Sequence, residues 1–379
     1  MQATERPNTK WDEIKRLDQR MSDSTQAQKA GAHSNQYQIA GDLVVVEGVT
    51  EDRAFEIARE AAKDVLSGLS LESGPVANDR IDKLDVRVVQ KLRDAGLLGA
   101  LGDPAVQVTL RKAQLGAASS ERESDYDLLA SLLEDRVKRP GDRPVRAGIN
   151  RAVEVVDQLD DSALLGLTLM QALVQYKPMA AEADEGIQIM ERFLSQLVPD
   201  LAALPTGAQW IEHLDVLDAV RVQTVQTFKP FDEFWPAKTP GYVAVGLPTI
   251  SESIVDAHRA LVGLGMSGTT VPHRYKPGFE RFPQPYSEAL ETVLERQGFK
   301  GKLVEDAVAL ARDQFLVDQV DPELTPKYMA EVRQQPVLGG IAEWWSGLAP
   351  YFTITTVGRV LARANAQRLD KLSMLPPLD

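Results

Sequence analysis

Residues 34–62 have the sequence SNQYQIAGDLVVVEGVTEDRAFEIAREAA and change from a strand pattern to a helix pattern within a few positions. Between Asn35 and Gly48, hydrophobic and polar side chains alternate, as they do in a half-buried β-strand. Gly41-Asp42, in the middle of this stretch, is a dipeptide suited to a two-residue hairpin turn. From Glu51 onward, hydrophobic residues recur at helical spacing. The sequence therefore predicts a short β-ribbon at 35–48 that is joined directly to a helix.

The predicted ribbon has one hydrophobic side, formed by Tyr37, Ile39, Leu43 and Val45. A two-stranded ribbon is marginally stable by itself in water, so it must gain further strands or pack on another surface. We expect these four residues to form an oligomer interface, at which the ribbons of several copies of the chain pair. The alternative is a hairpin that folds onto the helical domain of its own chain.

The composition is that of an ordinary soluble globular protein: 379 residues, of which 44% are hydrophobic and 26% charged. This length is enough for two or three hydrophobic cores. No uninterrupted apolar run reaches the ~18–20 residues of a membrane span. The first residues lack the apolar stretch of a signal peptide, and the chain has no cysteine for disulfides or thiolate metal sites. We therefore expect a cytoplasmic location and no membrane span.

The formal net charge of −13 bears on the choice of partners. Proteins that bind nucleic acid without sequence specificity present a basic face, because the release of counterions from the phosphates supplies much of their affinity. An acidic chain opposes this interaction. Nucleic-acid binding is therefore disfavoured, although local basic patches are compatible with the composition.

Helical patterns separated by proline and glycine dominate the chain after the ribbon. They predict a mainly α fold: a multi-helix globular body with a short N-terminal β-ribbon and a short C-terminal strand at Tyr351–Thr355. We expect four parts: a flexible arm (1–33), the ribbon with its helix (34–70), a helical domain (79–226), and a second helical domain (227–379). Among the expected helices are 163–176, 182–204, 206–226, 249–264, 286–297, 303–317 and 322–333.

Two stretches rich in proline and aromatic residues, 228–248 and 267–285, interrupt the helices of the second domain. Loops of this length inside a compact domain are usually functional or part of an interface. The second loop contains the most basic short patch of the chain, which is a candidate surface for an anion or an acidic partner. Its residues are His273, Arg274, Tyr275, Lys276 and Arg281. The alternative is a loop that packs on its own domain.

No motif in the sequence specifies a reaction. There is no glycine-rich phosphate-binding motif after a strand and no nucleophile elbow, so we assign no catalytic, cofactor-binding or metal-binding residues and expect no cofactor. The segment WIEHLDVLDAVR contains an acidic cluster of Glu212, Asp215 and Asp218, with His213 beside it. A solvated acidic helix face explains this cluster more simply than a metal site.

Near the C-terminus, the pattern predicts an amphipathic helix that carries Arg359 and Arg363 on one face. Val360, Leu361 and Ala364 are expected to face inward, and a solvated helix face is the simplest interpretation of the two arginines. Trp344 and Trp345, ahead of this helix, are expected in the core or in a subunit interface, because paired tryptophans dominate buried contacts.

Three segments resemble known groups of proteins. LLASLLEDRVKRPGDRPVRAGINRAVEVVDQLDDSALLGL (128–167) and FTITTVGRVLARANAQR (352–368) resemble bacterial abortive-infection proteins of the Abi-alpha type. Residues 34–62 resemble an uncharacterised bacterial family in which a polar ribbon leads into an amphipathic helix. The resemblance implies a bacterial, cytoplasmic protein of phage defence, and it carries over no active-site residues.

These observations favour a non-enzymatic oligomeric binding protein, one that acts in bacterial anti-phage defence or abortive infection. Its protein partner is not specified by the sequence. Two other hypotheses remain open. One is a metal-dependent hydrolase or nuclease that uses helical carboxylates, with the 212–218 cluster and Glu182, Asp184 or Glu185 as its first candidates. The other is a structural component of a phage or contractile particle.

Overall fold

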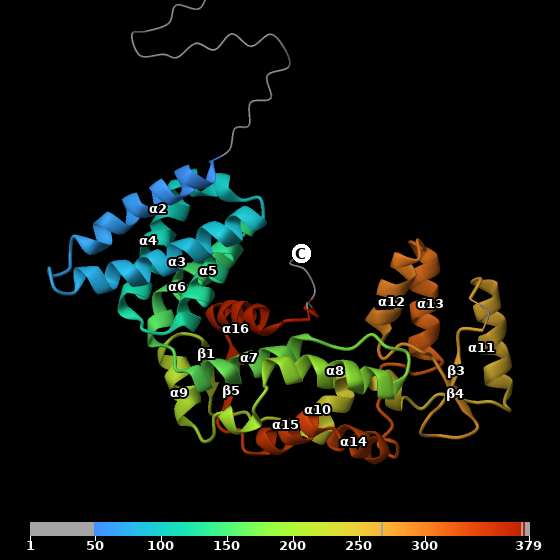
Figure 1. Ribbon diagram of the computed structural model, residues 1–379. Helices are drawn as coiled ribbons and strands as arrows, with labels where there is room; N and C mark the ends of the chain where they lie inside the picture. The colour runs from blue at the N-terminus through green and yellow to red at the C-terminus, as the bar shows by residue number, and fades with distance from the viewer. Residues whose placement is uncertain (1–48, 267, 373, 376–379) are drawn as a thin grey trace, which may run out of the picture. The chain divides into compact units, whose positions relative to one another are not determined.

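The computed structural model describes residues 49–375 except 267 and 373. Over this part of the chain it has fifteen α-helices and five short strands, which confirms the mainly α fold class (Figure 1). The predicted ribbon, with Tyr37, Ile39, Leu43 and Val45, and the predicted arm at 1–33 lie outside the described residues. Of the helices described, none is both long and apolar enough to cross a membrane.

Four helices in the first half of the chain begin where the sequence supplies a capping side chain. The N-cap residues Thr50, Asp103, Asp142 and Asp160 each accept a hydrogen bond from a backbone N–H in the first turn. The segment is α2 (Glu51–Leu66), α3 (Gly74–Asp94), α4 (Pro104–Ser119), α5 (Glu123–Lys138), α6 (Arg143–Val155) and α7 (Asp161–Gln175), with the short 3-10 turns η1 (Leu98–Gly102) and η2 (Val156–Gln158).

Helices also dominate the second half of the chain. They are α8 (Ala183–Leu197), α9 (Gln209–Val216), α10 (Phe231–Lys238), α11 (Glu252–Gly263), α12 (Ser287–Arg296), α13 (Lys302–Asp313), α14 (Thr325–Arg333), α15 (Pro336–Ser346) and α16 (Thr356–Leu369), with the 3-10 turns η3 (Leu201–Ala203) and η4 (Pro240–Val243). The two stretches rich in proline therefore contain short ordered elements.

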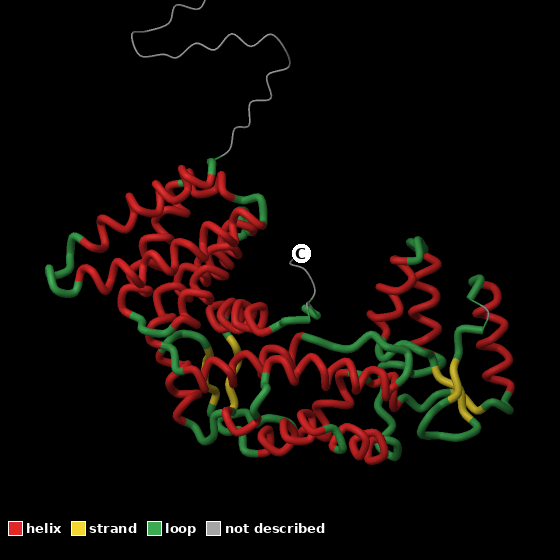
Figure 2. Tube along the Cα trace, viewed as in Figure 1, coloured by secondary structure: helices red, strands yellow, loops and turns green. Residues whose placement is uncertain are grey.

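Two small antiparallel sheets accompany the helices, and their strands are yellow in Figure 2. In the first, β1 (Val220–Gln223) pairs with β5 (Tyr351–Ile354), so that Val220 lies opposite Ile354. The second has the order β2 (Leu247–Pro248), β4 (Phe279–Arg281), β3 (Val271–Pro272). The predicted C-terminal strand is confirmed.

The expectation of one helix over 206–226 is wrong. Helix α9 ends at Val216, Asp218 has a positive φ of 63°, and the chain continues as strand β1. The backbone N–H and C=O groups of β5 need hydrogen-bond partners, and β1 supplies them by pairing with β5. This requirement comes from a distant part of the chain, so the local helical pattern did not reveal it.

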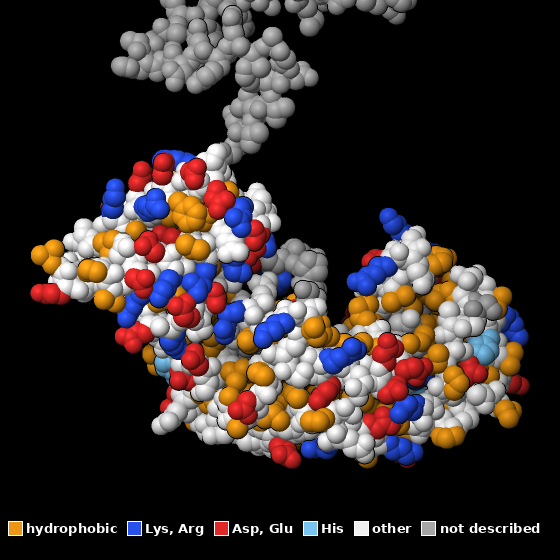
Figure 3. Space-filling view, viewed as in Figure 1, with side chains coloured by type: hydrophobic (Ala, Val, Ile, Leu, Met, Phe, Trp, Pro, Cys, Tyr) orange, Lys and Arg blue, Asp and Glu red, His pale blue; other side chains and the backbone are white. Residues whose placement is uncertain are grey.

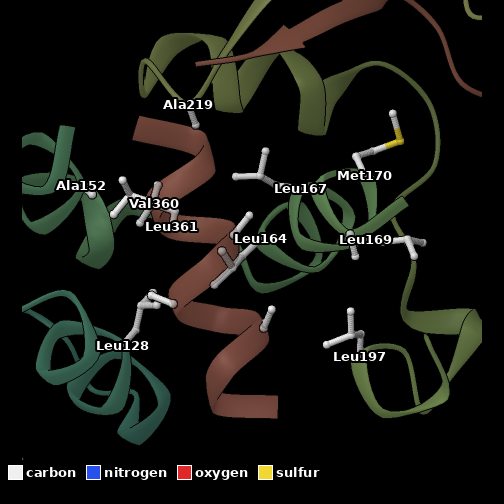
Figure 4. Close-up of a cluster of buried hydrophobic side chains, with 14 of the residues drawn as sticks. Leu128, Ala152, Leu164, Leu167, Leu169, Met170, Leu197, Ala219, Val360 and Leu361 are labelled. Carbon is white, nitrogen blue, oxygen red and sulfur yellow. The ribbon is translucent and has the colours of Figure 1, made fainter. Parts of the chain in front are cut away.

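Helix α16 lies at the centre of the main hydrophobic core. In Figure 4 it passes between helices from different parts of the chain, with Leu128 of α5 and Ala152 of α6 on one side and Leu164 and Leu167 of α7 on the other. Val360, Leu361 and Ala364 are buried, as the sequence predicts. The C-terminal helix thus completes the core that α5, α6 and α7 begin.

Two glycines allow α16 to approach its neighbours closely. A Cβ added at Gly358 would lie 2.0 Å from the carbonyl oxygen of Ala219, and one at Gly148 would lie 2.7 Å from Cγ2 of Thr356. Thr355, the N-cap of α16, also donates its hydroxyl and its backbone N–H to the Ala219 carbonyl. The start of α16 is therefore held against the end of the α9–β1 turn.

A second, smaller core lies among α11, α12 and α13. It contains Ile254, Leu290 and Phe315, and the ring of Phe282 makes an edge contact with that of Phe315. By its contacts, the chain from Gly48 onward forms one compact unit. The main core contains residues from both sides of position 226, and the division of the chain into the predicted domains stays a prediction.

A buried carboxylate joins α3 to α4. Both oxygens of Asp85 accept hydrogen bonds from Nε2 of Gln114, which also donates to the carbonyl of Ala58. Oε1 of Gln114 is buried and has no hydrogen-bond partner among the described residues. Burial raises the pKa of Asp85 to about 7, against the opposing effect of the Gln114 hydrogen bonds.

The close approach at Gly358 leads to a first prediction. Gly358→Ala should lower the free energy of unfolding by about 1–3 kcal/mol, because the new methyl group would collide with a backbone carbonyl that cannot move freely. Urea denaturation followed by circular dichroism measures this change. Gly74→Ala is the matched control, since a Cβ there meets nothing within 4 Å. Equal losses in the two variants would contradict the prediction.

Asp85 leads to a second prediction. Because its pKa is raised on folding, the unfolded chain loses this proton first, and stability should fall as the pH rises from about 4 to about 7. Asp85→Asn removes the buried charge and can donate to Oε1 of Gln114. We expect it to stabilise the protein at pH 8 by up to about 4 kcal/mol, with a smaller difference at pH 5.

Thermal unfolding at both pH values tests this expectation. Asp52→Asn, at an exposed position of α2, is the control and should not give this pH-dependent gain. A gain for Asp85→Asn that is the same at pH 5 and pH 8 would show that the carboxylate does not titrate in this range.

Candidate anion-binding site

A pocket of about 370 Å³ lies where α5 ends, α6 begins and α16 passes both of them. Its lining residues are Asp135, Arg139, Asp142, Pro144, Val145, Ile149, Gln175, Thr356, Arg359, Val360 and Arg363. Except for Gln175, all of them come from two short segments, 135–149 and 356–363. The fold therefore brings two distant stretches of sequence together at one site.

The spacing along α16 explains why it presents several side chains to the pocket. Thr356, Arg359, Val360 and Arg363 are separated by three or four residues, so they lie on one face of the helix. The buried residues Leu361 and Ala364 fix the rotation of the helix in the core. Burial of the apolar face thus directs this second face toward the pocket.

Three arginines converge on the pocket, and none of them forms a salt bridge with a described residue. Arg139 is the C-cap residue of α5, and Arg359 and Arg363 come from α16. Arg359 donates to the Ile354 carbonyl and to Oγ1 of Thr356.

The inner nitrogens of two of these arginines are also unsatisfied. The Nε donors of Arg139 and Arg363 are buried and have no hydrogen-bond partner in the described part of the chain. Buried polar groups in folded proteins are nearly always hydrogen-bonded. Arg139 and Arg363 share this feature with Arg136, Arg146 and Arg281, whose Nε donors are also buried without a partner among the described residues, but only the first two line the pocket.

Many charged side chains elsewhere on the surface form ion pairs. Acidic and basic side chains are interspersed over the helices shown in Figure 3, and many of them are paired. Arg87 contacts Glu123 and Asp127, and Arg151 contacts Asp218. The three arginines of the pocket have no such ion pair with a described residue, and neither do Arg136 and Arg146 of the neighbouring segment; what is particular to the three is that they line one cavity.

Two carboxyl groups line the pocket, in different environments. Asp135 is only 5% exposed, and burial raises its pKa, against the opposing effect of the charges of Arg363 and Arg139. Asp142 is the N-cap of α6, where its side chain accepts the N–H of Val145. Asp135 therefore interacts electrostatically with the arginines, whereas Asp142 caps helix α6.

The chemistry of this lining is that of anion recognition. A guanidinium group is planar, remains charged at all ordinary pH values, and can donate two parallel hydrogen bonds to a phosphate or carboxylate. Three such groups around a small pocket match an anion that carries more than one negative charge.

The basic patch predicted at 273–281 is brought together, but its charges have partners within the protein. Arg274 pairs with Glu331 and Asp184, and the hydroxyl of Tyr275 donates to Glu331. His273 is buried, and its Nε2 lies 2.7 Å from the carbonyl oxygen of Ala244. Burial lowers the pKa of His273.

The remaining cations of that patch are similarly engaged. Lys276 pairs with Asp321. Arg281 is 1% exposed and donates to the carbonyls of Phe282, Pro283 and Ala181, and it pairs with Glu182. These contacts tie the second proline-rich loop to the start of α8. Binding of an anion or partner by this patch stays a prediction.

Asp218, in the acidic segment around α9, forms ion pairs with arginines. Asp218 pairs with Arg151 and Arg221, and Oδ1 of Asp215 accepts the N–H of Val222. The two arginines hold the pKa of Asp218 below its usual range. Among the residues that the structure describes, no group of three or more metal-ligating side chains is found.

Sequence reasoning placed Arg359 and Arg363 on one helix face but did not connect them with Arg139 and Asp135. A usable signal was present in RVKRPGDRPVR (136–146), a run of basic residues across a helix–turn–helix. A concentration of arginine in a short turn is informative in an acidic chain. Its relation to the C-terminal helix, however, depends on the tertiary fold.

The fold and the pocket define a mainly α-helical protein with an arginine-lined cavity beside its central helix. The model of an uncharacterised protein family matches residues 48–374, which is most of the chain, and this protein belongs to that family. The chain has no match among curated proteins or among solved structures.

Proposed function

We propose that this protein is a non-enzymatic, oligomeric binding protein whose pocket holds the anionic group of a ligand, in the role of a bacterial defence protein. The observation that carries the proposal is the convergence of Arg139, Arg359 and Arg363 on one pocket without a salt bridge to any described residue. The anion would complete their hydrogen bonds.

An energetic argument supports a ligand at this position. Like charges brought close together in a partly buried site repel one another, and their separation from water adds a further cost. Asp142 and Asp135 line the pocket and offset part of this cost, Asp135 less fully because burial raises its pKa and so disfavours its charged form. A bound anion with two negative charges would neutralise most of the remaining positive charge.

The lining supports binding in preference to catalysis. It offers two carboxyl groups, one amide and one threonine hydroxyl, and it includes no histidine, lysine or serine. Asp142 is already used as a helix cap, and Arg139 and Arg363 are not placed beside a described nucleophile–base pair. A recognition site is therefore the simpler interpretation of these groups.

The defence role rests on sequence resemblance. The two stretches that resemble abortive-infection proteins of the Abi-alpha type, 128–167 and 352–368, contain every pocket residue except Gln175. Their meeting at one pocket supports the idea that they act together. In this proposal the anion is either a signal molecule or the group through which a partner is bound. The ribbon at 35–48 assembles the copies of the chain that respond to it.

Inorganic phosphate provides a direct test of the anion site. A ligand that binds only the folded state stabilises it by about 2.7 kcal/mol at one hundred times its dissociation constant. We expect sodium phosphate to raise the melting temperature above that in sodium chloride of equal ionic strength. Arg363→Gln should remove this difference, because it removes one of the three guanidinium groups.

Arg368→Gln is the matched control for this experiment. Arg368 lies on the same helix, does not line the pocket, and donates to Oδ1 of Asn365. The control should keep the response to phosphate even if its own stability changes. A phosphate response that is equal in the wild type and in Arg363→Gln would contradict the proposed site.

The oligomer is tested separately at the ribbon. Ile39→Asp or Leu43→Asp should lower the mass measured by light scattering, because each places a charge on the proposed hydrophobic interface. The helical circular dichroism signal should remain. Gln38→Asp, on the opposite polar side, is the control. A monomeric wild type would refute the proposed assembly.

A further inference from the structure

The lining of the arginine pocket has apolar as well as cationic parts. Pro144, Val145 and Ile149 come from the first turns of α6, and Val360 comes from α16 beside Arg359. A site for a bare inorganic anion needs donors only. An apolar wall next to the donors indicates a ligand that also carries an uncharged body.

The remaining polar residues of the pocket are suited to bind the uncharged part of the ligand. Asp135 is buried at the pocket, and Gln175, just after the last buried turn of α7, is exposed on its rim. A carboxylate can accept hydrogen bonds from N–H or O–H groups, and an amide can both donate and accept them. Neither function is needed to hold a phosphate, and both suit a nitrogen heterocycle or a sugar.

The dimensions limit the ligand to one small molecule. Binding sites for small molecules have volumes of about 300–1,000 Å³, so a pocket of about 370 Å³ lies at the lower end of this range. A nucleic-acid strand would also have to approach a chain of net charge −13, and polymers of phosphate are bound through extended basic surfaces. A monomeric ligand fits both observations better.

We propose that the ligand of this pocket is a nucleoside monophosphate. Its phosphate is bound by Arg139, Arg359 and Arg363, and its base lies against Val145 and Val360. Asp135 accepts a hydrogen bond from an amino or hydroxyl group of the ligand. This inference rests on the proposed anion site and adds the chemical class of the ligand to it.

Isothermal titration calorimetry of the full-length chain tests the inference with AMP, GMP, CMP and UMP. Inorganic phosphate, ribose 5-phosphate and adenosine serve as probes of the separate parts. We expect at least one mononucleotide to bind tenfold or more tightly than inorganic phosphate. Adenosine, which lacks the phosphate, should bind far more weakly than AMP.

Variants assign each part of the ligand to its part of the pocket. Arg363→Gln should weaken nucleotide and phosphate binding alike, by tenfold or more. Val145→Ser, at a half-buried position, should weaken only the nucleotide, because it removes apolar contact with the base. Asp135→Asn should change the order of preference among the four bases and leave phosphate affinity within a few-fold. If Arg363→Gln does not fold, the exposed Arg359→Gln replaces it.

The outcomes separate the two proposals. Phosphate binding that depends on Arg363, with no mononucleotide tighter than phosphate, overturns the nucleotide assignment and leaves the anion site in place. Ribose 5-phosphate binding as tightly as every mononucleotide also overturns it, because the base then contributes nothing. If neither phosphate nor any nucleotide binds, both proposals fail.

Discussion

The burial of one face of α16 is the interaction on which the rest of the structure depends. Val360, Leu361 and Ala364 enter a core formed by α5, α6 and α7 (Figure 4). Each fully buried valine or leucine side chain contributes about 1.5–3 kcal/mol. Gly358 and Gly148 let the helix come close enough for this contact, and Thr355 fixes its first turn on the carbonyls of Asp218 and Ala219.

The same burial creates the pocket. Once Leu361 and Ala364 face the core, the helical repeat places Arg359 and Arg363 together on another face. The last turn of α5 and its C-cap supply the buried Asp135 and Arg139. A ligand bound there would contact both segments, so it would stabilise the packing of the C-terminal helix as well as neutralise the arginines. In the proposed function, ligand binding would therefore be linked to stability at this point of the fold.

Electrostatics sets the pocket apart within an acidic protein. Many cations elsewhere on the described chain are paired, including those of the 273–281 patch, where Glu331, Asp321 and Glu182 are the partners. Paired surface charges contribute little to stability, and most are energetically close to neutral. Arginines that gather without such partners are more informative, because a folded chain has no structural need to bring them together.

By itself, the sequence determined the features that depend on neighbouring residues. Helical spacing interrupted by proline and glycine predicted the mainly α fold, and the pattern of 360–364 predicted which side of the last helix is buried. Only the tertiary structure decided that 220–223 is a strand and that Arg139 meets Arg363. Both depend on contacts between residues far apart in the chain, and no local pattern of side chains records such contacts.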